Sequence, residues 1–135
     1  MPSSALTALD GICVLVIDDD PDTRAIITAT LHHAGATMTS SAAGDHALDD
    51  LTQFRPDLII CDLQMPRLSG LEFVQRLRAR SKEEGGDIPV IAITAYREGW
   101  GDIQGRGFDF AACLLKPLNL DLLCELTATF GRRGA

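Results

Sequence analysis

The sequence has few positive charges. It contains 12 Lys and Arg residues against 19 Asp and Glu residues, which gives a formal net charge of −7 at pH 7 and a sequence pI near 4.7. Proteins that bind nucleic acid need a surplus of cationic side chains for the phosphates, and anionic membrane surfaces attract basic segments. The charge balance therefore argues against nucleic acid and against membranes as partners.

Long hydrophobic segments and paired cysteines are also missing. The N-terminus (residues 1–4) has neither the basic stretch nor the apolar run of a signal peptide, and no run is long enough to cross a membrane. The four cysteines form no C-x-x-C pair, and Cys13, Cys61 and Cys113 stand in apolar runs, where a thiol behaves as a small buried hydrophobe. We expect no zinc site and a reducing, cytoplasmic location.

What the sequence does contain is a regular alternation of apolar runs and helical patterns. Its 135 residues, 46% of them hydrophobic and 23% charged, suit one domain with a packed core. Continuous apolar runs at 12–17, 58–61, 90–93 and 111–115 are typical of parallel strands buried on both faces. The more polar segment 36–41 is predicted to be an edge strand.

Helical patterns separate these runs. The first helix is expected to start at Pro21 with Asp20 as its N-cap and to end at Gly35, and a second is expected over 44–54. Two further helices are expected to start after the caps Ser69 and Asn119. The residues predicted to face the core are Ile26, Ile27, Leu31 and Ala34, then Ala47, Leu48 and Leu51, then Leu71, Val74 and Leu77, and finally Leu122, Leu123 and Leu126.

The order of these elements predicts the fold class. Five strands alternating with helices give an α/β fold, a single doubly wound five-stranded parallel sheet with helices on both faces and right-handed crossovers. We expect an N-terminal lead-in at 1–10, one domain over 11–130 and a C-terminal tail at 131–135. Four glycines within 95–109 predict that any helix there is short or mobile, because each interior glycine costs a helix about 1 kcal/mol relative to Ala.

Polar residues follow the predicted strands at the points where they end. Asp18 and Asp19 follow the first strand, Asp62 the third, Thr94 the fourth and Lys116 the fifth. Because the carboxyl ends of parallel strands share one edge of a sheet, and ligands bind outside that edge, we expect these side chains to converge.

The residue types at this edge indicate phosphoryl chemistry. Two carboxylates ~4 Å apart repel each other by about 4 kcal/mol at an intermediate dielectric, so three of them need a cation or a proton. Oxygen ligands without His or Cys favour a hard ion such as Mg²⁺. Lys116 offers a compact charge for a phosphate oxygen, and Thr94 offers a hydroxyl. Since a carboxylate can act as a nucleophile toward a phosphoryl group, Asp62 is the predicted acceptor.

The segments around these residues resemble those of the response regulator receiver family of two-component signalling. Residues 14–21 (VLVIDDDP) look like its acidic-pair segment, and residues 56–66 (PDLIICDLQMP) look like its phosphoacceptor strand with the Met-Pro loop. Residues 89–95 (PVIAITA) and 115–118 (LKPL) look like the strands that carry the switch hydroxyl and the lysine. The likeness covers about residues 11–130.

The resemblance implies a flavodoxin-like sheet of order 2-1-3-4-5 and a metal-dependent phosphorylation. Asp62 would accept a phosphoryl group from phosphohistidine on a sensor histidine kinase or a histidine phosphotransfer protein. The chain would not be an enzyme beyond catalysing its own phosphorylation and dephosphorylation at Asp62. Mg²⁺ would be held by Asp62, directly by Asp19, mainly through water by Asp18, and by the backbone carbonyl of Gln64.

The remaining implied roles concern the signal. Thr94 would move toward the phosphate and report its presence, and Lys116 would pair with Asp62 or with its phosphate. The peptide bond between Lys116 and Pro117 would be cis, as in similar proteins. Gln64 and Tyr96 stand where the family varies the residues that tune the lifetime of the phosphate.

The sequence also departs from the family pattern. The family usually has Tyr or Phe three residues before the lysine, where this chain has Cys113. The glycine usually found seven residues before the lysine is replaced by Asp109. The stretch 99–107, which contains Trp100, would form the helix that often serves as a docking surface. These departures bear on the output of the domain and leave the acceptor chemistry as it is.

Two other functions remain open. Asp18 and Asp20 have the D-x-D spacing of haloacid dehalogenase phosphatases, although the chain is short and has no Gly-Asp-x-x-x-Asp segment. A degenerate receiver that binds proteins without phosphate is favoured by Cys113 and the glycine-rich stretch, whereas the intact acceptor, acidic and lysine positions argue against it. The chain is either a stand-alone regulator or the receiver of a longer protein such as a hybrid kinase.

Overall fold

The computed structural model describes residues 8–95 and 110–132. The expectations for Tyr96, Trp100, Asp109 and the stretch 99–107 lie outside these residues. The elements are β1 (Cys13–Ile17), α2 (Pro21–His33), β2 (Thr37–Ser41), α3 (Gly44–Asp50), β3 (Leu58–Asp62), α4 (Gly70–Arg78), the short 3-10 helix η1 (Lys82–Glu84), β4 (Val90–Thr94), β5 (Ala112–Leu115) and α6 (Leu120–Gly131).

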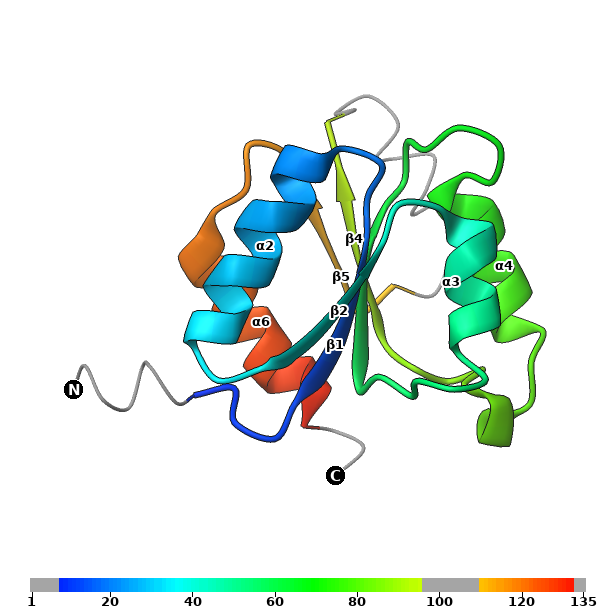
Figure 1. Ribbon diagram of the computed structural model, residues 1–135, viewed down its shortest axis with the longest axis horizontal. Helices are drawn as coiled ribbons and strands as arrows, with labels where there is room; N and C mark the ends of the chain where they lie inside the picture. The colour runs from blue at the N-terminus through cyan, green and yellow to red at the C-terminus, as the bar shows by residue number, and fades with distance from the viewer. Residues whose placement is uncertain (1–7, 96–109, 133–135) are drawn as a thin grey trace.

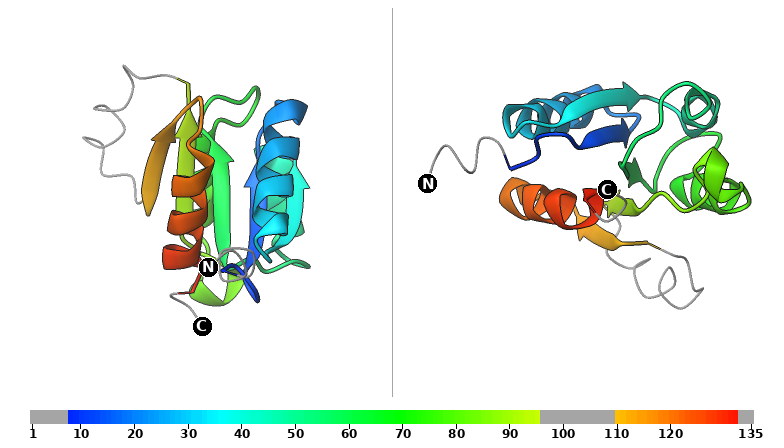
Figure 2. Two further views of the ribbon diagram at one scale, coloured as in Figure 1. Left: turned by 90° about the vertical axis from the view of Figure 1, so that its left-hand side faces the viewer. Right: turned by 90° about the horizontal axis from the view of Figure 1, so that it is seen from below.

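The five strands form one parallel sheet in the order β2-β1-β3-β4-β5, which confirms the predicted fold class and strand order. Helices α2 and α6 cover one face of the sheet, and α3 and α4 cover the other (Figure 1). Figure 2 shows the same three layers from the side and from below. No helix among the described residues has both the length and the apolar composition to cross a lipid bilayer.

The sheet separates two hydrophobic cores. Along β1, Val14 and Val16 belong to the core under α2 and α6, whereas Leu15 and Ile17 belong to the core under α3 and α4. All four side chains are fully buried. Because both faces of the strand are covered, neither face carries polar residues, and this explains the continuous apolar run in the sequence.

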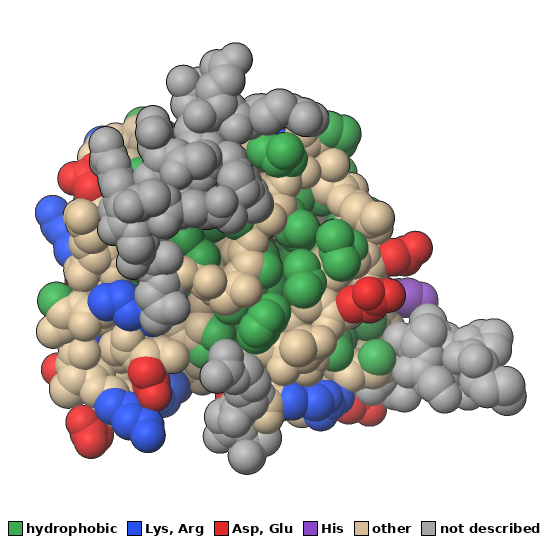
Figure 3. All heavy atoms as spheres, turned by 180° about the vertical axis from the view of Figure 1, so that it is seen from behind, with side chains coloured by type: hydrophobic (Ala, Val, Ile, Leu, Met, Phe, Trp, Pro, Cys, Tyr) green, Lys and Arg blue, Asp and Glu red, His purple; other side chains and the backbone are tan. Residues whose placement is uncertain are grey.

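Burial decreases from the central strands toward both edges of the sheet. Every residue of β3 and β4 is buried, whereas all four residues of β5 are only partly buried. β2, the other edge strand, is also mostly open, as its polar sequence predicted. Seen from behind, the described hydrophobic side chains gather in the middle of the molecule and charged side chains lie along its margin (Figure 3).

The helix starts follow the predicted caps. The carboxylate of Asp20 accepts the N–H of Asp22, and the amide oxygen of Asn119 accepts the N–H of Leu122. Ser69 and Glu72 form a reciprocal capping box at the start of α4. Each such cap satisfies a backbone donor that a helix leaves unpaired, which stabilises the start of the helix by about 1 kcal/mol.

Some predicted core positions are wrong. Ile26 is 53% exposed and Leu122 is 37% exposed, because each lies on the outer side of its helix, next to the residue that points inward. The helix expected over 44–54 ends at Asp50, and residues 51–53 form a turn. Conversely, Phe73 was not among the predicted core residues and is fully buried under α4.

The N-terminal turn packs against the domain. Leu9 is fully buried in the core under α2 and α6, and its N–H donates to the carbonyl of Ala34 over 2.9 Å. Gly11 and Gly35 have φ values of +83° and +111°, which glycine adopts without steric cost. The segment predicted as a lead-in therefore contributes one core side chain, and α6 extends to Gly131 at the start of the predicted tail.

Candidate functional site

The strand register brings the predicted acids to one edge of the sheet. In the β1–β3 pair, Ile17 lies opposite Cys61. The residues that come directly after this pair, Asp18 and Asp62, therefore lie side by side. Thr94 ends β4 on the other side of β3 and is 1% exposed. These residues come from distant parts of the sequence, and the parallel pairing alone suffices to place them together.

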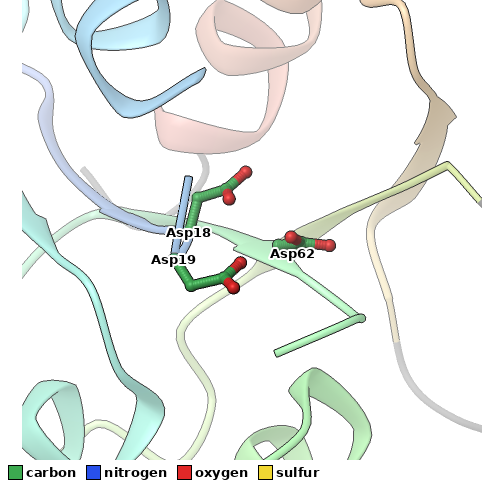
Figure 4. A group of neighbouring side chains, drawn as sticks. All are labelled: Asp18, Asp19 and Asp62. Atoms are coloured by element: carbon green, nitrogen blue, oxygen red, sulfur yellow. The ribbon is translucent and has the colours of Figure 1, made fainter. Parts of the chain in front are cut away.

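Three carboxylates converge at this edge. Asp18, Asp19 and Asp62 each offer one oxygen, and these oxygens all lie within 4.8 Å of one another. Figure 4 shows the acidic pair of the β1 end beside Asp62 at the end of β3, with the carboxylates of the pair turned toward the side where Asp62 lies. Asp18 is fully buried and Asp62 is 3% exposed, whereas Asp19 is open to solvent. The cluster is therefore accessible from one side.

Lys116 contacts both buried acids. Its Nζ lies 3.1 Å from Oδ2 of Asp18 and 3.4 Å from Oδ2 of Asp62. The other oxygens accept backbone N–H groups, Oδ1 of Asp18 from Asp20 over 2.9 Å and Oδ1 of Asp62 from Gln64 over 3.0 Å. One ammonium shared by these two acids cannot neutralise the three-carboxylate cluster, so negative charge remains when all three acids are ionised.

This arrangement perturbs the ionisation of Asp62. Burial raises the pKa of Asp62 to about 6, and the negative charge of Asp18 adds to the rise, while the Gln64 N–H and Lys116 act in the opposite direction. Burial alone would lower the pKa of Lys116, but its hydrogen bond to Asp18 and the charges of both acids raise it. Lys116 is therefore charged, and Asp62 is mostly ionised at neutral pH.

Asp20, the third acid of the run, does not join the cluster. Its carboxylate accepts the hydroxyl of Thr23 over 2.8 Å and the N–H of Asp22 over 3.1 Å at the start of α2. The hydroxyl of Thr23 and the N–H of Asp22 lower the pKa of Asp20. The D-x-D spacing of Asp18 and Asp20 therefore supplies one site carboxylate and one helix cap, which does not suit a phosphatase that uses both.

The donor set fits Mg²⁺. The ligand atoms that the cluster offers are carboxylate oxygens, and hard divalent cations prefer such oxygens to nitrogen or sulfur. A divalent ion would also neutralise the charge that Lys116 leaves uncompensated. Asp18, Asp19 and Asp62 are thus the residues that could hold the metal.

The end of β5 is tied to the end of β4. The backbone N–H of Lys116 donates to the carbonyl of Thr94 over 2.8 Å, and the Lys116-Pro117 peptide bond is cis, as the resemblance implied. Cys113 is partly buried and packs in a small cluster with Ala92 and Phe110. Burial raises the pKa of the Cys113 thiol to about 11, so the thiol stays protonated at neutral pH.

Gly70, to which the sequence alone assigned no packing role, lies directly against Asp62 and Leu63. A Cβ at this first residue of α4 would lie 2.4 Å from the carbonyl oxygen of Asp62 and 2.6 Å from Cα of Leu63. The N–H of Gly70 donates to the carbonyl of Leu63 over 3.2 Å. The start of α4 can approach the end of β3 this closely only because the residue has no side chain.

The substitution Gly70→Ala is therefore expected to lower the free energy of unfolding by about 2 kcal/mol, since the contacted atoms are backbone and cannot move aside. Urea unfolding followed by circular dichroism measures this. Gly44→Ala is the matched control, because Gly44 is also the first residue of a helix and the nearest atom to its Cβ would be the flexible side-chain end of Leu68 at 3.2 Å, followed by Cβ of Phe73 at an ordinary 3.5 Å. Equal losses in the two variants would contradict the account.

Comparison with known proteins agrees with this geometry. The family described as response regulator receiver domain matches residues 14–128. The transcriptional regulatory protein PrrA of Mycobacterium leprae is 34% identical over 130 residues, which cover 96% of this chain and 54% of PrrA. The regulator of RpoS of Escherichia coli is 37% identical over 120 residues, 87% of this chain and 34% of that protein. The chain thus spans about half or less of these relatives.

Solved structures show the same fold. The receiver domain of Francisella response regulator 1452 superposes with a TM-score of 0.81 at 26% identity, covering 93% of this chain and all of that one. The response regulator TrrA of Thermotoga maritima, solved in complex with Mg²⁺-BeF, gives a TM-score of 0.75 at 29% identity, with 88% and 98% covered. Fold, edge cluster and family match agree, and the chain belongs to the receiver domain family of two-component response regulators.

Proposed function

We propose that this receiver accepts a phosphoryl group on Asp62 with Mg²⁺ as cofactor, and that it acts in the cytoplasm. The donor would be phosphohistidine on a sensor histidine kinase or a histidine phosphotransfer protein. The observation that supports this most strongly is the position of the Asp62 carboxylate, within 4.8 Å of two other carboxylates and 3.4 Å from Lys116. The chain would not be an enzyme that acts on a separate substrate. It would catalyse only its own phosphorylation and dephosphorylation at Asp62.

The metal site would use the acidic cluster. Asp19 and Asp62 would hold Mg²⁺ directly, Asp18 mainly through water, and Gln64 through its backbone carbonyl. The Mg²⁺-BeF complex of TrrA, a receiver of the same fold, supports this assignment by similarity. When bound, Mg²⁺ would neutralise the charge between Asp62 and the incoming phosphoryl group.

The residues of the chain would then carry out the transfer. Asp62 attacks in its ionised form, and a pKa of about 6 keeps that form predominant at neutral pH. The bond between an Asp62 oxygen and phosphorus forms as the phosphorus–nitrogen bond to histidine breaks, and its electron pair stays on the imidazole. Lys116, which already contacts Asp62, would donate a hydrogen bond to a phosphoryl oxygen. Its ammonium group would thus stabilise the negative charge of the transferred group without having to move into place.

Thr94 would transmit the phosphorylation of Asp62 to the surface of the domain. It ends the strand next to Asp62, is buried, and shares a backbone hydrogen bond with Lys116. Its hydroxyl would turn toward the phosphate, and a partner surface would change with it. Because Cys113 stands where the family has an aromatic side chain, the output would not depend on an aromatic ring at that position.

A second candidate is a phosphate-independent interaction module, which the partly buried Cys113 favours, since the aromatic side chain that normally responds to the threonine is absent. In that case the Asp62→Asn variant would bind the same partners as the wild type. The complete acidic cluster and Lys116 support phosphorylation as the first candidate.

Incubation with acetyl phosphate tests the proposal. We expect one added phosphoryl group by intact mass in the presence of Mg²⁺, none with EDTA, and none for Asp62→Asn. Asp57→Asn is the control, since Asp57 is an exposed acid that accepts the N–H of Cys13 away from the cluster. Phosphorylation that persists in Asp62→Asn would show that Asp62 is not the acceptor.

A further inference from the structure

Arg24 is a cation near the acidic cluster that the proposed chemistry does not use. It lies on α2, and its Nη1 donates to the main-chain carbonyl of Asp18 over 2.7 Å. The side chain is partly buried and borders a shallow hollow between α2 and β2, together with Pro21, Thr28 and Ser40. Its removal would therefore not open a void in either hydrophobic core.

The contact completes the anchoring of Asp18. The N–H of Asp18 donates to the carbonyl of Ser41 on β2 over 3.1 Å, and its carboxylate oxygens bind the Asp20 N–H and Lys116. Arg24 holds the remaining polar atom of the residue. That atom belongs to the peptide group that links Asp18 to Asp19, so its orientation helps set the direction in which the Asp19 side chain leaves the backbone.

Asp19 depends on such support more than the other acids. Asp18 and Asp62 are buried and bound to Lys116, whereas Asp19 is open to solvent at the end of the strand. We infer that Arg24 is a positioning residue of the metal site, which fixes the Asp18–Asp19 peptide so that the Asp19 carboxylate faces Asp62. This inference rests on the proposed function, because it concerns the affinity of that site for Mg²⁺.

The chemistry of arginine suits the task. A guanidinium donates from a rigid planar fork and stays charged at all relevant pH values, and hydrogen bonds from a charged donor are stronger than those between neutral groups. Groups that orient metal ligands without touching the metal change affinity by roughly 10- to 100-fold when they are removed. A positive charge near a cation site would by itself weaken metal binding, so positioning and charge predict opposite effects of removing Arg24.

The test measures Mg²⁺ affinity without any phosphoryl donor. Wild type, Arg24→Lys and Arg24→Met are titrated with MgCl₂ and followed by amide NMR spectra. Arg76→Lys and Arg76→Met serve as matched controls, because Arg76 is an exposed arginine in the last turn of α4. The amide resonance of Asp19 in the metal-free protein gives a second readout, since its N–H shares the peptide group whose carbonyl Arg24 binds.

We expect both Arg24 variants to raise the dissociation constant for Mg²⁺ about tenfold and to shift the metal-free Asp19 resonance, while the Arg76 variants change neither. Arg24→Lys keeps the positive charge, so weaker Mg²⁺ binding in this variant must come from lost geometry and not from lost charge. This variant also keeps the test valid if Arg24→Met does not fold. An unchanged affinity in Arg24→Lys, or tighter binding in Arg24→Met, would overturn the inference while the proposed function stands. A wild type that binds no Mg²⁺ would overturn both.

Discussion

Replacing Asp62 by Asn is expected to raise the free energy of unfolding of the metal-free protein by about 3 kcal/mol at neutral pH. Burial, together with the charge of Asp18, raises the pKa of Asp62 from 3.8 to about 6 in the folded protein, and such a difference corresponds to about 3 kcal/mol. The ionised carboxylate thus destabilises the fold, and asparagine has the same shape without the charge. Urea unfolding in EDTA measures the difference.

The pH dependence of this difference follows from the direction of the shift. Because the folded state binds the proton more tightly than the unfolded state, the stability that Asp62 contributes is complete below about pH 4 and is lost as the pH rises through about 6. Wild type and Asp62→Asn should therefore have equal free energies of unfolding below about pH 4, and Asp62→Asn should become the more stable of the two as the pH rises. Asp49→Asn, at an exposed position on α3, is the matched control. A constant difference at all pH values would contradict the account.

Replacing Lys116 by Met is expected to slow the Mg²⁺-dependent phosphorylation by acetyl phosphate roughly 100-fold, the usual cost of losing one preorganised group that stabilises developing charge. Lys116 contacts both Asp18 and Asp62, and its charge now lowers the pKa of Asp62. Without it, that pKa rises further, a larger fraction of Asp62 is protonated at neutral pH, and the nucleophile is scarcer. Rates measured by intact mass at several pH values should show the loss together with a shift of the profile to higher pH.

Lys82→Met is the matched control for this prediction, because Lys82 and Lys116 are the two lysines of the chain and Lys82 is exposed on η1. It should be phosphorylated at the wild-type rate. If Lys116→Met were phosphorylated as fast as Lys82→Met, the transferred group would not meet the ammonium of Lys116, and the proposed role of that residue would be wrong.

The strands and the acidic cluster could be predicted from the sequence because their signals are local or topological. β1 and β3 are buried on both faces, so they read as unbroken apolar runs, and a parallel sheet then forces Asp18 and Asp62 to the same edge. Asp20 and Ser69 could be predicted as caps because capping depends on residues within one turn. These rules need no knowledge of which helix packs where.

Features that depend on packing between distant segments could not be predicted. Ile26 follows the helical spacing yet points outward, because the hydrophobic stripe of α2 is narrower than its apolar sequence suggests. The burial of Leu9 depends on a turn that meets the end of α2, and the absence of a side chain at Gly70 matters only because α4 begins against Asp62. The contact from Arg24 to Asp18 crosses a helix start and leaves no periodic signal in the sequence.

Titration of the metal-free protein with beryllofluoride, with and without Mg²⁺ and followed by amide NMR spectra, tests most directly whether the edge cluster forms a metal-dependent acceptor. Beryllofluoride takes the place of the phosphoryl group on a carboxylate. The account predicts that beryllofluoride shifts the amides of Asp62, Thr94 and Lys116 beyond any change caused by Mg²⁺ alone, that it does so only when Mg²⁺ is present, and that Asp62→Asn does not respond to beryllofluoride. A response without Mg²⁺, the same response in Asp62→Asn, or no response in the wild type would contradict it.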